Sequence, residues 1–159
     1  MRGLLGWLLV FVLALAAVGG GLLLLQSRDD AEVGGAATGP GERVSDRCPA
    51  RSARVTRDRR KLSRDQIQTA LEEGNVVILY AGRLPQELRQ LQRDYTGGAF
   101  DAEIAAAGQA VVLVRNGVPS GYQARAWGRR LTVEVPQGQK LREFTEAWLG
   151  QGAPTPCPS

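Results

Sequence analysis

An uninterrupted apolar run near the N-terminus is the feature that most constrains what this chain can fold into. Residues 4–25 read LLGWLLVFVLALAAVGGGLLLL and contain no charged side chain. As a helix this run would be about 33 Å long, which is enough to cross a hydrocarbon core of about 30 Å. A core helix of a globular protein would show a polar stripe, and this run has none. The run therefore predicts a transmembrane anchor at residues 4–25.

A cleaved secretory signal is the alternative interpretation of the same run, because residues 14–16 offer small side chains suited to a cleavage site. Apolar residues resume at Leu22, however, whereas the apolar region of a signal usually ends after about 7 to 15 residues. No cysteine follows the run closely enough for lipoprotein acylation. The anchor is favoured over the signal.

The flanking charges predict the orientation of the anchor. Residues 1–3 include Arg2, whereas the other flank opens with Arg28, Asp29, Asp30 and Glu32. The positive-inside rule then keeps residues 1–3 in the cytoplasm. We expect a single-pass protein of the plasma membrane whose C-terminal domain lies outside the cytoplasm.

The positive charge of the chain is concentrated just before the expected domain. Residues 42–65 carry nine basic and four acidic side chains, whereas the chain from residue 66 onward carries nine of each. The sequence pI of about 9.6 is therefore no argument for nucleic-acid binding. A polybasic segment could contact anionic lipid headgroups or envelope polymers. A solvated linker is the favoured alternative, because residues 26–61 offer few apolar side chains with which to order themselves.

These patterns predict the following organisation: a flexible basic tether at 26–61, an extracytoplasmic domain at 62–150 and a Pro-rich tail at 151–159. Cys48 and Cys157 bracket the domain, and in an oxidising exterior they are well placed to form a disulfide. Free thiols and bridges to another chain are the alternatives.

Periodicity predicts the elements of the domain. The first helix has Ser63 as its N-cap, Gln66 completing a capping box, and Gly74 at its end. Two unbroken apolar runs read as strands buried on both faces, and two later segments alternate as half-buried strands do. The order favours an α/β sandwich in which a mixed sheet of about four strands packs its helices against one face. The expected strands are 76–80, 110–115, 122–127 and 131–135, and the further helices begin near 85, 100 and 140.

Several short motifs resemble a known family. Residues 71–80 read LEEGNVVILY, residues 126–130 read AWGRR, and Phe144 and Gly152-Ala153-Pro154 follow. In this order and spacing they resemble the membrane-anchored domain-of-unknown-function family 3105 of bacteria. Members of that family typically carry His-x-Leu-Glu-His-Gly at the end of the first helix, and two such imidazoles could hold a metal or a proton-transfer site. This chain has Thr69 and Glu73 at those positions and no histidine anywhere, so we do not expect it to share that chemistry.

Three groups of residues are candidates for function. Trp127, Arg129 and Arg130 could bind a carboxylate, a phosphate or a glycan, although a core Trp127 with solvated arginines is favoured. Glu72 and Glu73 are adjacent on a helix and point about 100° apart, which does not suit an acid–base pair. The serines lack a histidine partner or a GxSxG setting. We therefore expect no catalytic residue, no metal site and no cofactor.

The sequence leaves three functions open. The first is a non-catalytic binding or accessory domain, held to the bilayer by residues 4–25, with an envelope protein or polymer as partner. The second is a degenerate or carboxylate-based metal-binding or hydrolytic domain. The third is a membrane assembly or scaffold role, for which Gly19-Gly20-Gly21 offers a small-residue face for helix packing.

Overall fold

A computed structural model of the chain describes residues 39–116, 121–136 and 138–157. The predicted anchor at 4–25, the beginning of the expected tether and the last two residues lie outside this range. Within the described part, no helix combines the length and the apolar character that a membrane crossing requires.

The domain is built from five strands and four helices that follow the predicted order, with one addition at the start. They are β1 (Glu42–Arg43), α2 (Arg64–Glu73), β2 (Val76–Tyr80), α3 (Gln86–Thr96), α4 (Ala102–Ala106), β3 (Val111–Arg115), β4 (Tyr122–Ala126), β5 (Arg129–Val133) and α5 (Gly138–Trp148).

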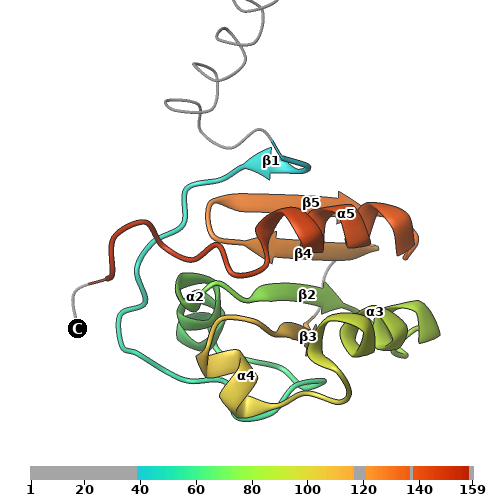
Figure 1. Cartoon of the computed structure of the whole chain (residues 1–159), viewed down its shortest axis with the longest axis horizontal. Helices are drawn as coiled ribbons and strands as arrows, with labels where there is room; N and C mark the ends of the chain where they lie inside the picture. The colour runs from blue at the N-terminus through green and yellow to red at the C-terminus, as the bar shows by residue number, and fades with distance from the viewer. Residues whose placement is uncertain (1–38, 117–120, 137, 158–159) are drawn as a thin grey trace, which may run out of the picture. The chain divides into compact units, whose positions relative to one another are not determined.

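The strands form one mixed sheet in the order β1-β5-β4-β2-β3, which Figure 1 shows stacked from β1 to β3. Only β2 and β3 are parallel, with Val76 opposite Val111, and the other neighbours are antiparallel. The prediction of a mixed sheet is confirmed. The fifth strand was missed because β1 is only two residues long and has no apolar pattern of its own.

Helices cover both faces of the sheet, so the expectation that they pack against one face is wrong. Alternate residues of β2 belong to different cores: Ile78 packs with α3 and α5, whereas Val77 packs with α2 and α4. All five residues of β2 are buried, as its unbroken apolar sequence predicts. A sheet covered on one face would have left half of these side chains in water.

Part of the expected tether is an ordered piece of the domain. β1 pairs with β5 at one edge of the sheet, while the Arg59 N–H donates to the Leu113 carbonyl of β3 at the opposite edge. Between these edges Val55 is buried in the core beneath α2 and α4. Residues 39–61 therefore belong to the same compact unit as the helices and the sheet, whereas the sequence suggested a domain that begins at Leu62. The composition did not predict this order because backbone pairing and side chains at scattered positions, among them Asp46, Val55 and Arg59, hold the segment without a high apolar content.

The first helix and the tail are locked together. Ser63 and Gln66 form the predicted capping box, and Gly74 ends α2 in the left-handed conformation. The Ala153 N–H then donates to the Glu72 carbonyl, and the Gly150 N–H donates to the Gly74 carbonyl. The tail after α5 therefore folds back on the end of α2.

Candidate functional site

A polar pocket lies between α2, β4 and the segment that follows β1. It has a volume of about 740 Å³, within the range of about 300 to 1,000 Å³ that small-molecule sites usually occupy. Leu79 and Asn116, near the carboxyl ends of β2 and β3, form one side, and Ser63 at the start of α2 forms another. In open α/β sheets, ligands commonly bind at the carboxyl ends of the parallel strands.

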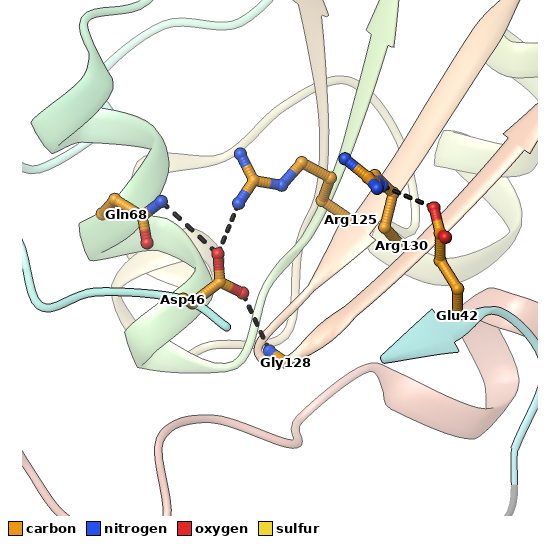
Figure 2. A network of polar contacts seen from close by, with 6 residues as sticks. All are labelled: Glu42, Asp46, Gln68, Arg125, Gly128 and Arg130. Carbon is orange, nitrogen blue, oxygen red and sulfur yellow. Dashed lines mark hydrogen bonds and ion pairs between the residues drawn. The ribbon is translucent and has the colours of Figure 1, made fainter. Parts of the chain in front are cut away.

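Asp46 lines this pocket, and Figure 2 shows the polar contacts that its carboxylate makes. Its Oδ1 accepts hydrogen bonds from Arg125 of β4 and, at 3.5 Å, from Gln68 Nε2 of α2. Its Oδ2 accepts the Gly128 N–H at 2.8 Å from the turn between β4 and β5. The Asp46 side chain is only 2 % exposed and that of Arg125 20 % exposed. One carboxylate thus joins three separate parts of the domain.

Gln68, which also lines the pocket, leaves an acceptor unused. The residue is 7 % exposed, and its Oε1 has no hydrogen-bond partner among the described residues. The Asp46 carboxylate beside it can only accept hydrogen bonds, so the amide must turn Nε2 toward Asp46 and Oε1 away from it. A buried acceptor without a partner is costly, and such groups in native proteins call for an explanation.

Positive charge dominates the lining of the pocket. Arg47, Lys61, Arg64 and Arg125 stand against the single carboxylate of Asp46. The start of α2 adds to this field, because the first N–H groups of a helix lack internal partners and carry a partial positive charge. Asp65, the acidic residue of this turn, accepts the Ala50 N–H and does not line the pocket. The arrangement suits an anion.

The predicted binding group of Trp127, Arg129 and Arg130 does not converge on one spot. Arg129 lies 4.5 Å from the centre of the Trp148 ring, on the α5 side of the sheet. Trp127 packs against the opposite core, beneath α2 and α4. Arg130 pairs with Glu42 of β1, where both side chains are well exposed (Figure 2). Successive residues of a strand face opposite sides, which separates the two arginines.

The positions that resemble the family's histidines have structural contacts here. Thr69 is buried, and its hydroxyl accepts the Ala53 N–H of the ordered segment. Burial is the largest influence on Glu73 and raises its pKa; Arg54 lowers that pKa and Glu72 raises it. Glu72 itself accepts the Cys157 N–H through Oε1. These side chains hold the segment between β1 and α2, and the tail after α5, against α2.

Cys48 and Cys157 form a disulfide in the structure, with their Cα atoms 5.5 Å apart. This is the pairing favoured from the sequence, and no free cysteine is found in the described part of the chain. In the same part, no three His, Cys, Asp or Glu side chains gather as metal ligands would.

Two buried amides that none of the predicted sites included hold the cores together. Asn75 donates to the carbonyls of Ala70 and Ala105 and accepts the Ala110 N–H. Gln92 donates to Asp58 and to the Val111 carbonyl and accepts from Arg59. For Asn75, a polar residue between a helix-ending glycine and an apolar strand was the available signal. Asp46, Gln68 and Arg125 were also missed, because nothing local in the sequence brings them together.

Comparison with known proteins relates this chain to a family. A family model described as "Protein of unknown function (DUF3105)" matches residues 54–158, about two thirds of the chain. The match begins within the segment expected to be a tether and includes Cys157 but not Cys48. No curated protein and no solved structure matches the chain.

Proposed function

We propose that this chain, which belongs to the DUF3105 family of proteins of unknown function, is a non-catalytic binding domain of the cell envelope. Residues 4–25 anchor it in the plasma membrane, residues 1–3 stay in the cytoplasm, and the domain acts outside.

The disulfide between Cys48 and Cys157 is the observation that best supports this location. Disulfides persist in oxidising compartments and are rare where thiols are kept reduced. The bridge joins the ordered segment after β1 to the tail after α5, so it closes nearly the whole domain in one loop. Such a loop suits a domain that must stay folded outside the cell.

A binding role is favoured over catalysis for two reasons. The chain has no histidine, which is the commonest general base and a common metal ligand. The pocket beside α2 instead offers several cations and a buried amide, which is a set of groups suited to recognition.

Topology reporters test the proposal in living bacteria. Alkaline phosphatase is active only outside the cytoplasm and green fluorescent protein fluoresces only inside it, so each is fused after Ser159. We expect an active phosphatase fusion, a dark fluorescent fusion and retention of both in the membrane after carbonate washing. Fluorescent cells, or a chain released into the medium with a trimmed N-terminus, would refute the location.

A further inference from the structure

The pocket beside α2 combines an acceptor without a partner with an excess of positive charge. Gln68, 7 % exposed, presents to this pocket an amide whose Oε1 accepts no hydrogen bond from the described residues. Rotation about the last side-chain bond of glutamine meets only a broad, shallow preference. The long 3.5 Å bond from its Nε2 to Asp46 holds the amide weakly. Oε1 is closed to solvent in this structure, so a hydroxyl in the pocket reaches and satisfies it once the amide has turned about that last bond.

The charges define the other half of the ligand. Asp46 already accepts hydrogen bonds from Arg125, Gln68 and Gly128. Arg47, Lys61 and Arg64 then remain as cations around the opening, all of them exposed. A phosphate group carries about 1.5 to 2 negative charges at neutral pH and three strong acceptor oxygens. It matches this excess better than a single carboxylate does.

The start of α2 points toward the same place. Ser63 and Arg64 both line the pocket, and α2 is ten residues long. The first backbone N–H groups of such a helix are donors suited to phosphate oxygens. The capping box uses Ser63 Oγ for the Gln66 N–H and Gln66 Oε1 for the Ser63 N–H, which leaves the Arg64 and Asp65 N–H groups outside it.

We propose that this pocket binds a phosphomonoester that carries a hydroxyl group close to its phosphate. Lys61, Arg64 and the N-terminus of α2 hold the phosphate, and Gln68 Oε1 accepts the hydroxyl. This inference rests on the proposed binding function and names its ligand class.

Calorimetric titration of the full chain in phosphatidylcholine nanodiscs tests the ligand class with three probes. Glycerol 3-phosphate carries both groups, inorganic phosphate lacks the alcohol, and glycerol lacks the phosphate. We expect one-to-one binding of glycerol 3-phosphate, about tenfold weaker binding of phosphate, and no heat from glycerol; a tenfold change is what one good hydrogen bond can supply. Equal affinity for the two phosphates, or no binding of either, would overturn the proposal.

A matched pair of charge variants tests the phosphate half. Lys61→Gln with Arg64→Gln removes two pocket cations, and Arg83→Gln with Arg89→Gln removes two exposed cations that do not line it. We expect the first variant to weaken binding of both phosphates by about tenfold or more. The second should leave both affinities within about twofold. Equal losses of affinity in the two variants would show that binding depends on the overall positive charge of the domain and not on a specific site.

Gln68→Met tests the hydroxyl half with a side chain of similar length and no acceptor. The variant removes the unpartnered buried oxygen, which favours the empty protein, and the long hydrogen bond from Nε2 to Asp46, which costs little, so we expect it to fold with a nearly unchanged urea midpoint. We expect the preference for glycerol 3-phosphate over phosphate to disappear while the affinity for phosphate stays unchanged. An unaltered preference would place the hydroxyl elsewhere and refute the role of Gln68.

The same titration in phosphatidylglycerol nanodiscs tests a lipid phosphodiester as a competitor. Unchanged binding would support a soluble phosphomonoester as the ligand, whereas loss of the binding seen in phosphatidylcholine would show that a phosphodiester headgroup occupies the pocket and would overturn the proposed ligand class. The purified protein reports on the pocket and the fusions report on location, so each proposal can fail without the other.

Discussion

At the scale of single residues, Asp46 is the side chain whose surroundings matter most. It is almost fully buried, it pairs with a mostly buried Arg125, and it caps the turn at Gly128. Glu42 makes a comparable pair with Arg130, but both of those side chains are about half exposed. Water screens an exposed pair and leaves it worth little, whereas a buried charge without its partner is costly.

We predict that Asp46→Asn lowers the free energy of unfolding by about 2 to 3 kcal/mol, because Arg125 loses its carboxylate while Gly128 keeps an acceptor. Glu42→Gln is the control and should cost less than about 0.5 kcal/mol. Urea midpoints measured by pulse proteolysis of the purified chain give both values. Similar small losses in the two variants would show that the burial of Asp46 carries no energetic weight.

Glu73 makes stability depend on pH. Burial raises its pKa above the ordinary value of 4.5, so the folded state binds this proton more tightly than the unfolded state does. Ionisation of Glu73 therefore costs stability, and the cost grows as the pH rises from 4.5 through the folded-state pKa.

We predict that Glu73→Gln is more stable than the wild type at pH 7 and that the difference shrinks to nothing below pH 4.5. Glu87→Gln, which changes an exposed carboxylate in the first turn of α3, should show no such gain. Urea midpoints at a series of pH values provide the test. Glu73 Oε2 accepts a 3.5 Å hydrogen bond from Asn75 Nδ2. A Glu73→Gln variant less stable than the wild type at pH 7 would mean that this bond or the electrostatic attraction of Arg54 outweighs burial.

At the scale of elements, α2 holds the domain together. It borders the pocket at its start, packs on β2 along its length and receives the tail at its end. Its beginning was predictable from Ser63 and Gln66, because a capping box involves residues only three apart.

We predict that Ser63→Ala destabilises the domain by about 1 kcal/mol through loss of the acceptor for the Gln66 N–H. Ser52→Ala, an exposed serine outside every helix and strand, is the control and should change the urea midpoint negligibly. An unchanged midpoint for Ser63→Ala would imply that the cap seen in the structure contributes nothing to α2.

The close approach of the turn after α4 to the end of α2 also sets how the elements pack. Gly108 has φ +72°, and a Cβ added to it would stand 1.8 Å from the Glu73 carbonyl oxygen. Gly82 has nearly the same backbone, φ +69°, but nothing within 4 Å of an added Cβ. The two glycines thus have the same left-handed backbone, but only at Gly108 would an added Cβ meet another part of the chain.

We predict that Gly82→Ala costs about 1 kcal/mol, the cost of left-handed backbone alone, and that Gly108→Ala costs more than about 3 kcal/mol because α2 and α4 must separate. Thermal and urea unfolding of the two variants gives the comparison. Equal losses would mean that the packing between α2 and the turn after α4 relaxes freely.

At the scale of the whole molecule, the Cys48–Cys157 bridge closes a loop with a sequence separation of 109 residues. In the chain-entropy model such a bridge restricts the unfolded chain and stabilises the fold by about 4.7 kcal/mol. Because the bridge ties the segment after β1 to the tail, both ends of the domain depend on it.

We predict that Cys48→Ser combined with Cys157→Ser lowers the free energy of unfolding by about 3 to 5 kcal/mol and exposes residues 43–61, with their many arginines, to trypsin. The wild-type chain should migrate faster on non-reducing than on reducing gels, and the double variant should not. A wild-type chain that carries two thiols when isolated from cells would contradict the bridge.

The sequence alone determined what local spacing can encode. The helix starts and ends, the two buried strands and the first alternating strand followed from side-chain period and capping residues, and the motifs at 71–80 and 126–130 indicated the family. The second alternating strand was expected at 131–135, but β5 covers Arg129–Val133, so Arg129 and Arg130 belong to the strand and not to the turn before it. Physical interactions between residues a few positions apart suffice for each of these features.

Tertiary structure alone decided which distant residues meet. It brought Asp46, Gln68 and Arg125 together across 79 positions of the chain, placed helices on both faces of the sheet and turned a polar, arginine-rich segment into an ordered part of the domain. It also sent Arg129 and Arg130 to opposite sides. These outcomes depend on which strand edges pair and on which side of the sheet each connection passes, and those choices arise from the packing of the whole domain.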